Sequence, residues 1–170
     1  MHADDLNALD MSSPDRKRAA YAELLKQAEA LFHGERDWLA NASQFSALIA
    51  QQVPELNWAG FYLNRAGELV LGPFQGKVAC VRIPFDKGVC GACARTGEIQ
   101  LVEDVHAFPG HIACDGASNA ELVLPVRAGA ELWGVFDMDS PRHGRFDAID
   151  ADGMSKLVSL FIRASDLPVG

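Results

Sequence analysis

The apolar residues of this chain change their spacing at Pro54, from the period of helices to that of short strands. Before Pro54, one helical segment begins after the cap residue Ser13 and a second covers about residues 37–52. After Pro54 the apolar runs are short, until a last helical segment begins at Asp147 or Asp150. This order predicts an α+β domain in which helices pack on a central antiparallel sheet of about six strands.

The short apolar segments after Pro54 have the length and residue types of strands. Two pairs of them flank turns, at 64–67 and around Ala128-Gly129, and are predicted to form hairpins. Small residues at 88–96 predict one or two helical turns, and residues 106–119 a long loop. The predicted strands are 57–63, 68–74, 78–83, 99–103, 122–127 and 131–138.

The length of 170 residues suits one domain with a sizeable core. We expect residues 13–165 to form this domain. The polar residues 1–12 are expected to be a flexible N-terminus, and residues 166–170 a flexible tail.

The charge and the composition of the chain argue against several classes of protein. A formal net charge of −8 is unfavourable for binding nucleic acid, which depends on Lys and Arg. The acidic start of the chain does not resemble a signal peptide, and no apolar run approaches the ~20 residues of a membrane helix. We therefore expect a cytoplasmic protein whose cysteines are reduced at rest, so that any disulfide is transient and catalytic.

Three cysteines, Cys80, Cys90 and Cys114, precede the last predicted hairpin. Free cysteines are most often buried and inert, and Cys80, in a predicted strand, fits that alternative best. Cys90 begins a predicted helix, where the helix dipole lowers a thiol pKa. Cys114 lies beside His111 and Asp115 in a polar, glycine-containing loop, where a buried thiol is not expected. We therefore predict that Cys114 is chemically active.

Cys90 also forms a C-x-x-C pair with Cys93. In a thioredoxin-like order of strands and helices this pair would indicate a dithiol redox site, but the predicted order here is different. A structural zinc site with His111 and Cys114 is a further alternative, although a second paired set of ligands is missing from the sequence. We predict no metal and no cofactor.

Acidic residues gather in the last two predicted strands. Asp137 and Asp139 share one face if the strand includes both, whereas both lie in solvent if it ends at Met138. Glu121, at the start of the neighbouring strand, could join them in an acidic cluster. Such a cluster suits a substrate ammonium group, and mutual repulsion could raise one carboxyl pKa enough for proton donation. Trp58, early on a strand, could form one wall of a small apolar pocket.

These residues lie in motifs that resemble those of the free methionine-(R)-sulfoxide reductases, a family of enzymes with a GAF fold. The resemblance extends from about Tyr21 to Phe161 and includes the order of the motifs and the spacing of the three cysteines. The motifs are Trp58-Ala-Gly-Phe-Tyr62, Gly88-Val-Cys-Gly91, Glu103-Asp-Val-His106, Gly110-His-Ile-Ala-Cys-Asp115, Ser118-Asn119, Glu121-Leu-Val-Leu-Pro125 and Gly134-Val-Phe-Asp-Met-Asp-Ser140.

The resemblance implies a single GAF-like catalytic domain that reduces free L-methionine-(R)-sulfoxide to methionine. It implies that Cys114 attacks the sulfoxide and that Cys80 and Cys90 resolve the oxidised intermediate. It further implies a homodimer that thioredoxin recycles. Cys93 departs from the family pattern. The substrate-binding residues that it implies are Trp58, Tyr62, Glu121, Asp137 and Asp139.

Thiol chemistry supplies a mechanism for this reaction. The Cys114 thiolate attacks the sulfoxide sulfur while an acid, for which Glu121 is the best candidate, protonates the oxygen. Methionine leaves, Cys114 becomes a sulfenic acid, and a second thiol converts it to a disulfide that an external reductant opens. The main alternative is a non-catalytic GAF domain that senses a small ligand, and a further one is a redox sensor without turnover. The ligand sensor would explain the fold but not why thiols and acids gather around one loop, whereas the redox sensor would use the same cysteines.

Overall fold

Six strands form one antiparallel sheet in the order β3-β2-β1-β6-β5-β4, which confirms the predicted fold class. The structure is a computed structural model that describes residues 8–112 and 116–168, so Cys114 lies outside the described residues. In chain order the elements are α1 (Pro14–Phe32), α2 (Trp38–Gln52), β1 (Trp58–Arg65), β2 (Glu68–Gly76), β3 (Arg82–Pro84), α3 (Gly88–Thr96), β4 (Gln100–Val102), the short 3-10 helix η2 (Val105–Ala107), β5 (Ala120–Ala128), β6 (Glu131–Ser140) and α4 (Ala148–Ala164).

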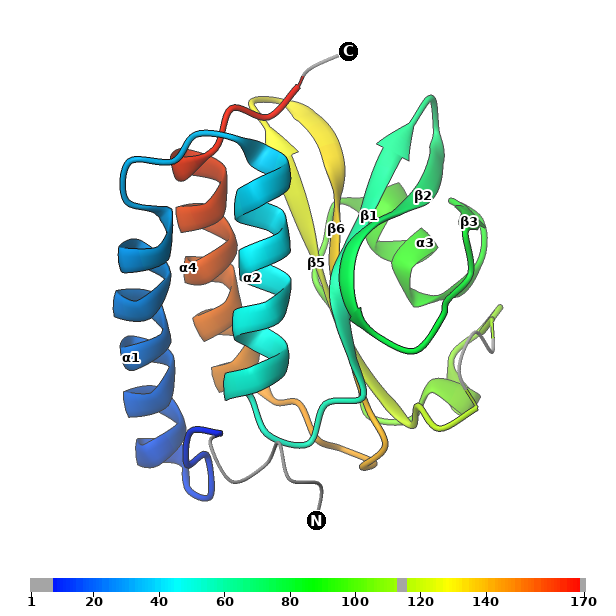
Figure 1. The fold of residues 1–170 in the computed structure, drawn as a ribbon. Coiled ribbons are helices and arrows are strands. Elements are labelled where there is room, and N and C mark those ends of the chain that lie inside the picture. Colours follow the sequence, from blue (N-terminus) through cyan, green and yellow to red (C-terminus); the bar gives the residue numbers. More distant parts are fainter. Residues whose placement is uncertain (1–7, 113–115, 169–170) are drawn as a thin grey trace.

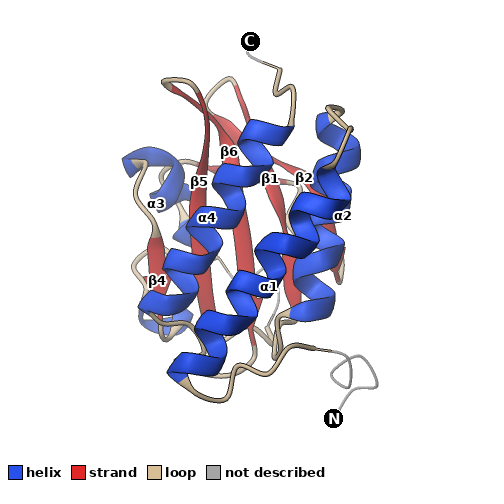
Figure 2. Cartoon of the chain, turned by 90° about the vertical axis from the view of Figure 1, so that its left-hand side faces the viewer, coloured by secondary structure: helices blue, strands red, loops and turns tan. Residues whose placement is uncertain are grey.

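The three long helices α1, α2 and α4 cover one face of the sheet, and the short helix α3 lies on the other (Figure 1). Figure 2 shows the long helices in front of the strands. Each face has its own apolar cluster. Phe61 and Phe136 belong to the cluster under the long helices, whereas Tyr62, Val123 and Val135 belong to the cluster under α3. Because side chains alternate along a strand, each central strand serves both clusters.

Side-chain caps begin each of the long helices. Ser13 accepts a hydrogen bond from an N–H of the first turn of α1, and Asp37 does the same for α2. Asp147 and Asp150 form a capping box at the start of α4. Helix α3 differs, because its N-cap residue is Lys87 and no side chain of the described residues caps it. The first turn of α3 is therefore open to other partners.

A buried network of charges joins α1 to the start of α4. Asp150 is fully buried, and its carboxylate lies 2.9 Å from Lys17 Nζ and 3.3 Å from Arg145 Nη1. The Tyr21 hydroxyl donates to Asp150 Oδ1 at 2.7 Å. On this face of the sheet a buried carboxylate is thus surrounded by cations and donors, as burial of a charge requires.

The strand predicted at 78–83 is wrong for most of its length, because β3 includes only residues 82–84. The β-branched residues Val78 and Val81 suggested a strand, yet Val78 is 90% exposed. The segment is held instead by donors from β1: Trp58 Nε1 donates to the carbonyl oxygen of Lys77 at 3.2 Å, and the Tyr62 hydroxyl to that of Cys80 at 2.9 Å. Cys80 therefore lies outside the strands, between β2 and β3.

The described parts of both terminal segments are attached to the domain. Leu9 and Met11 pack against the helical core, and the Leu9 N–H donates to the carbonyl oxygen of Gln52. Asp166 forms a bridge with Asp37. The flexibility expected for 1–12 and 166–170 stays a prediction. Among the described residues, no helix is long and apolar enough to cross a membrane.

Candidate active site

A cavity of about 50 Å³ lies on the α3 face of the sheet. Its walls come from the central strands β1, β5 and β6, from the first turn of α3 and from the loops that precede β3 and β5. Its lining includes six residues that the sequence singled out: Trp58, Tyr62, Cys90, Glu121, Asp137 and Asp139. Two further predicted residues are not in this lining: Cys80 is absent from it, and Cys114 lies outside the described residues.

Strand register brings the three acids together. β6 continues to Ser140, so Asp137 and Asp139 both belong to the strand, and the alternative in which it ends at Met138 is wrong. Glu121 on β5 is the direct cross-strand partner of Asp139. Residues two apart on one strand share a face, so Asp137 lies diagonally opposite Glu121 on the same side.

Glu121 and Asp137 are both buried, with 9% and 5% of their surface exposed. Among the described residues that line the cavity there is no Lys or Arg to balance their charge. Burial raises the pKa of Glu121 well above its usual value, and repulsion from Asp137 and Asp139 raises it further. Burial also raises the pKa of Asp137, although hydrogen bonds with Glu121 and Cys90 oppose the rise. Glu121 is therefore the acid that most readily keeps a proton to donate.

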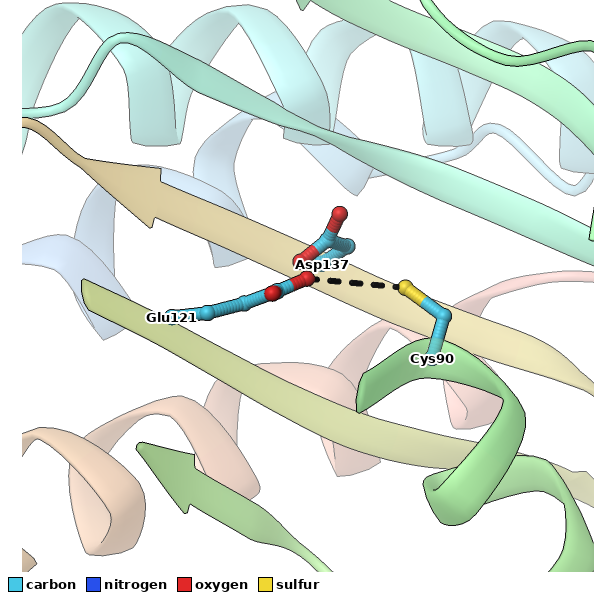
Figure 3. Close-up of side chains that lie close together, drawn as sticks. All are labelled: Cys90, Glu121 and Asp137. Atoms are coloured by element: carbon cyan, nitrogen blue, oxygen red, sulfur yellow. Dashed lines mark hydrogen bonds between the residues drawn. The ribbon is translucent and has the colours of Figure 1, made fainter. Parts of the chain in front are cut away.

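Cys90 lies in the first turn of α3, with its sulfur 3.7 Å from Glu121 Oε1 (Figure 3). The sequence suggested that the helix N-terminus would lower the pKa of this thiol, but the structure contradicts that suggestion. Burial raises the Cys90 pKa well above its ordinary value, and the nearby charges of Asp137 and Glu121 add to the effect. The Cys90 thiol is thus a proton donor to Glu121 rather than a ready nucleophile.

The remaining described cysteines differ in state. Cys90 and Cys93 are free thiols, and Cys93 is fully buried. Burial, followed by the charge of Asp137, raises the pKa of Cys93 to about 12. Cys80 is half-buried against the apolar cluster under α3, and its sulfur is disulfide-bonded.

Aromatic rings of β1 form another part of the cavity wall. The Trp58 ring stacks on Tyr62, with 5.7 Å between centroids, and on Phe74, with 5.2 Å. Because the polar hydrogens of Trp58 and Tyr62 are donated to the carbonyl oxygens of 77 and 80, both rings offer mainly apolar ring atoms to the cavity that they line. An apolar wall of this kind suits a methyl or methylene group.

Sequence reasoning did not assign a role to Ile112 or Ser118, which also line the cavity. Ser118 is 8% exposed, and its hydroxyl oxygen accepts a hydrogen bond from Asn57 Nδ2 at 3.1 Å. The sequence signals for Ser118 were its place in the polar segment immediately before β5 and in the Ser118-Asn119 motif of the family resemblance.

Three donor atoms at this site could together approach a cation. The sulfur of Cys90 and one carboxylate oxygen from each of Glu121 and Asp137 lie within 4.8 Å of one another. The raised pKa values of these groups oppose the deprotonation that metal binding needs, so the arrangement suits an organic cation better.

Comparison with known proteins places this fold in a known class. The sequence profile of the GAF domain matches residues 40–162. A free methionine-R-sulfoxide reductase of Escherichia coli is 49% identical over 143 residues, which cover 84% of this chain and 87% of that protein.

Solved structures agree with this match. Free methionine-R-sulfoxide reductase from Neisseria meningitidis, in complex with its substrate, has a TM-score of 0.84 and 40% identity and covers 93% of this chain and 95% of that chain. A candidate GAF sensor protein from Burkholderia vietnamiensis has a TM-score of 0.85 and 53% identity and covers 88% of this chain and 95% of that chain. The chain belongs to the GAF-domain free methionine-(R)-sulfoxide reductase family.

Proposed function

We propose that this protein reduces free L-methionine-(R)-sulfoxide to methionine by thiol chemistry in the cavity under α3. The observation that carries this proposal is the buried pair Glu121 and Asp137, which faces the cavity without a lysine or arginine in the described lining. A cationic ligand compensates such a pair, and the α-ammonium group of a free amino acid is a cation of suitable size. The relatives named as free methionine-R-sulfoxide reductases support the same substrate.

The reaction follows from the groups that surround the cavity. The Cys114 thiolate attacks the electrophilic sulfur while Glu121 delivers a proton to the sulfoxide oxygen, which is a poor leaving group without it. The oxygen is transferred to Cys114 as a sulfenic acid, and methionine leaves. Trp58 lies against the methyl group, and Asp137 and Asp139 hold the ammonium group.

A second thiol then displaces water from the sulfenic acid and forms a disulfide. The free state of Cys90 and the disulfide-bonded state of Cys80 favour Cys80 as the main resolving cysteine, with Cys114 as its partner in the proposed disulfide. Cys90 is the second resolving candidate. The dithiol of thioredoxin exchanges with the disulfide and restores both thiols. The proposal also includes that the protein is a homodimer and that it is cytoplasmic, a compartment in which this reductant is available.

The test is to incubate the protein with free methionine-(R)-sulfoxide and a dithiol and to measure the methionine formed. The S epimer and the N-acetylated R epimer serve as matched controls, since the second lacks the ammonium group. We expect methionine from the free R epimer and little from either control. Binding of the free R epimer without any methionine would instead favour the alternative of a ligand-sensing GAF domain.

A further inference from the structure

The segment between β2 and β3 exposes apolar side chains beside a disulfide. Val78 is 90% exposed and Val81 is 62% exposed, which makes them the two most exposed large apolar residues in the described part of the chain. Both lie within two residues of Cys80, whose sulfur is disulfide-bonded. Single exposed apolar residues are common on protein surfaces, but a pair of them on either side of a redox cysteine indicates a surface that a partner covers.

Hydrogen bonds from the sheet hold this segment in place. Trp58 and Tyr62 on β1 donate to the carbonyl oxygens of 77 and 80. The N–H of Leu71 on β2 donates to the carbonyl oxygen of Val81 at 2.9 Å. Three carbonyl groups of the segment are thus bound by neighbouring strands, so its main chain is positioned before a partner arrives, which lowers the entropic cost of docking.

The charge of the segment differs from that of the chain as a whole. Lys77 begins the segment and Arg82 follows it, and both side chains are exposed, whereas the chain has a formal net charge of −8. Arg82 forms an exposed ion pair with Glu68 at 3.1 Å, so Lys77 supplies most of the positive charge that a partner meets. An apolar surface with a basic end fits a partner whose own apolar surface is bordered by acidic residues.

We propose that Val78 and Val81 form the docking surface for the protein dithiol that reduces the Cys80 disulfide. This inference rests on the proposed function, in which thioredoxin is that dithiol, and it adds the surface of contact and the sulfur that is attacked. Cys80 is half-buried, so a partner that contacts the residues on both sides of it aligns its thiolate with this sulfur.

The exchange then has two steps. A thiolate of the partner attacks the Cys80 sulfur, the disulfide bond breaks, and the other cysteine of that disulfide leaves as a thiolate that takes up a proton from water. The second thiol of the partner loses its proton and attacks the mixed disulfide. The partner is thereby oxidised to its own disulfide, and Cys80 leaves as a thiolate that is protonated in turn.

The experiment traps the mixed disulfide and does not depend on methionine formation. Protein oxidised with diamide is mixed with reduced thioredoxin in which serine replaces the second active-site cysteine, so that the second step cannot occur. Peptide mass spectrometry identifies the cysteine that carries thioredoxin. The test variant is Val81→Asp, because Val78 also lines the cavity. Leu39→Asp is the matched control, since Leu39 is 52% exposed and lies on α2, on the other face of the sheet.

We expect thioredoxin on Cys80. Val81→Asp should slow its attachment by about tenfold, because a charge replaces an apolar contact, whereas Leu39→Asp should change the rate little. Reduction by dithiothreitol should be unchanged in both variants, since a small dithiol needs no docking surface. Lys77→Glu should slow the thioredoxin reaction more at low salt than at high salt. Attachment to another cysteine, or equal rates for Val81→Asp and Leu39→Asp, would overturn the inference.

Further outcomes separate the inference from its alternatives. If Val81→Asp fails to fold, Val81→Ser, which adds no charge, decides by the same comparison. If size-exclusion chromatography shows that the folded variant has a different oligomeric state from wild type, the surface belongs to a second copy of the chain and the inference fails. Trapping on Cys80 that depends on Val81, in a protein that forms no methionine with dithiothreitol, would refute the proposed function alone. Methionine formation together with trapping that does not depend on Val81 would refute the inference alone.

Discussion

The two faces of the sheet bury acidic residues in opposite ways. Under the long helices, Asp150 lies between Lys17 and Arg145 and joins α1 to α4. Under α3, Glu121 and Asp137 are buried beside a cavity whose described lining has no lysine or arginine. A buried acid that is paired with cations holds parts of the domain together, whereas buried acids without a paired cation favour the binding of a cationic ligand.

The same strands supply side chains to both faces of the sheet. This explains how the protein stays folded although the burial of the acids at the cavity is unfavourable. On β5, Leu122 and Leu124 are buried in the large core, while Glu121 faces the cavity. On β6, Phe136 belongs to the core and its neighbour Asp137 to the cavity. The apolar packing on one face offsets the desolvation of acids on the other, so the chain can hold Glu121 in its protonated state before the substrate arrives.

The largest expected effect concerns the cysteine that is proposed to attack at the cavity. Cys114→Ser should abolish methionine formation even in a single turnover, since serine is a far weaker nucleophile at neutral pH. Cys80→Ser should release about one methionine per site and then stop, because the sulfenic acid still forms. Cys93→Ser is the matched control and should turn over almost normally. A full burst from Cys114→Ser, together with none from Cys90→Ser, would make Cys90 the nucleophile.

The second effect separates the roles of the two buried acids at the cavity. Glu121→Gln should slow the chemical step by about 10²–10⁴-fold, because the side chain can no longer give up a proton. Asp137→Asn should mainly raise KM, since it removes a charge that holds the ammonium group. Single-turnover rates and substrate titrations distinguish these outcomes. An unchanged single-turnover rate in Glu121→Gln would move the role of general acid to Asp139.

The third prediction tests the acid on the opposite face. Asp150→Asn should lower the free energy of unfolding by about 3 kcal/mol, because Lys17 and Arg145 stay buried without their full counter-charge. It should leave kcat/KM unchanged at a temperature at which the variant is folded. Asp152→Asn, which breaks the exposed pair with Lys156, is the control and should cost less than about 0.5 kcal/mol. Equal losses in denaturant unfolding would contradict the distinction between the faces.

Local sequence patterns predicted the fold class, whereas they left open whether the acids share a face, because the strand could have ended at Met138. The structure decides this point: the strands extend to include Glu121 and Asp139, and alternation along them brings both acids to one side. The segment from Val78 to Val81 could not be predicted in this way. Its conformation depends on donors from Trp58 and Tyr62, which are distant in sequence.

Burial in the folded protein also determines the pKa of the Cys90 thiol. Its position at a helix N-terminus predicted a lowered pKa, whereas the pKa is raised. The helix N-terminus acts within one turn of α3, whereas the carboxylates that face Cys90 come from β5 and β6. The role of Cys114 stays a prediction, because this residue lies outside the described part of the chain.

The fourth prediction uses pH to compare wild type with Glu121→Gln in thermal unfolding. In the unfolded chain Glu121 loses its proton near its ordinary value of 4.5, whereas the folded protein keeps it to higher pH. Wild-type stability should therefore fall as the pH rises above 4.5 and until the raised folded pKa is passed. Glu121→Gln has no carboxyl proton to lose, so its stability does not fall in this way. The difference in Tm between the variant and wild type should therefore grow in favour of the variant over the same pH interval. A difference in Tm that stays constant across this range would show that Glu121 is not protonated in the folded protein.

The smallest effect concerns the aromatic wall. Tyr62→Phe keeps the ring that stacks on Trp58 but removes the hydrogen bond to the carbonyl oxygen of Cys80. We expect a loss of about 1 kcal/mol in the free energy of unfolding, the usual contribution of one neutral hydrogen bond. Tyr62→Ala, which also removes the ring, should lower the free energy of unfolding more than Tyr62→Phe does and should raise KM more. Denaturant unfolding and initial rates measure both quantities. If Tyr62→Phe raises KM as much as Tyr62→Ala does, the hydroxyl rather than the ring is what the substrate site needs, either through direct contact or through its hold on residues 77–81.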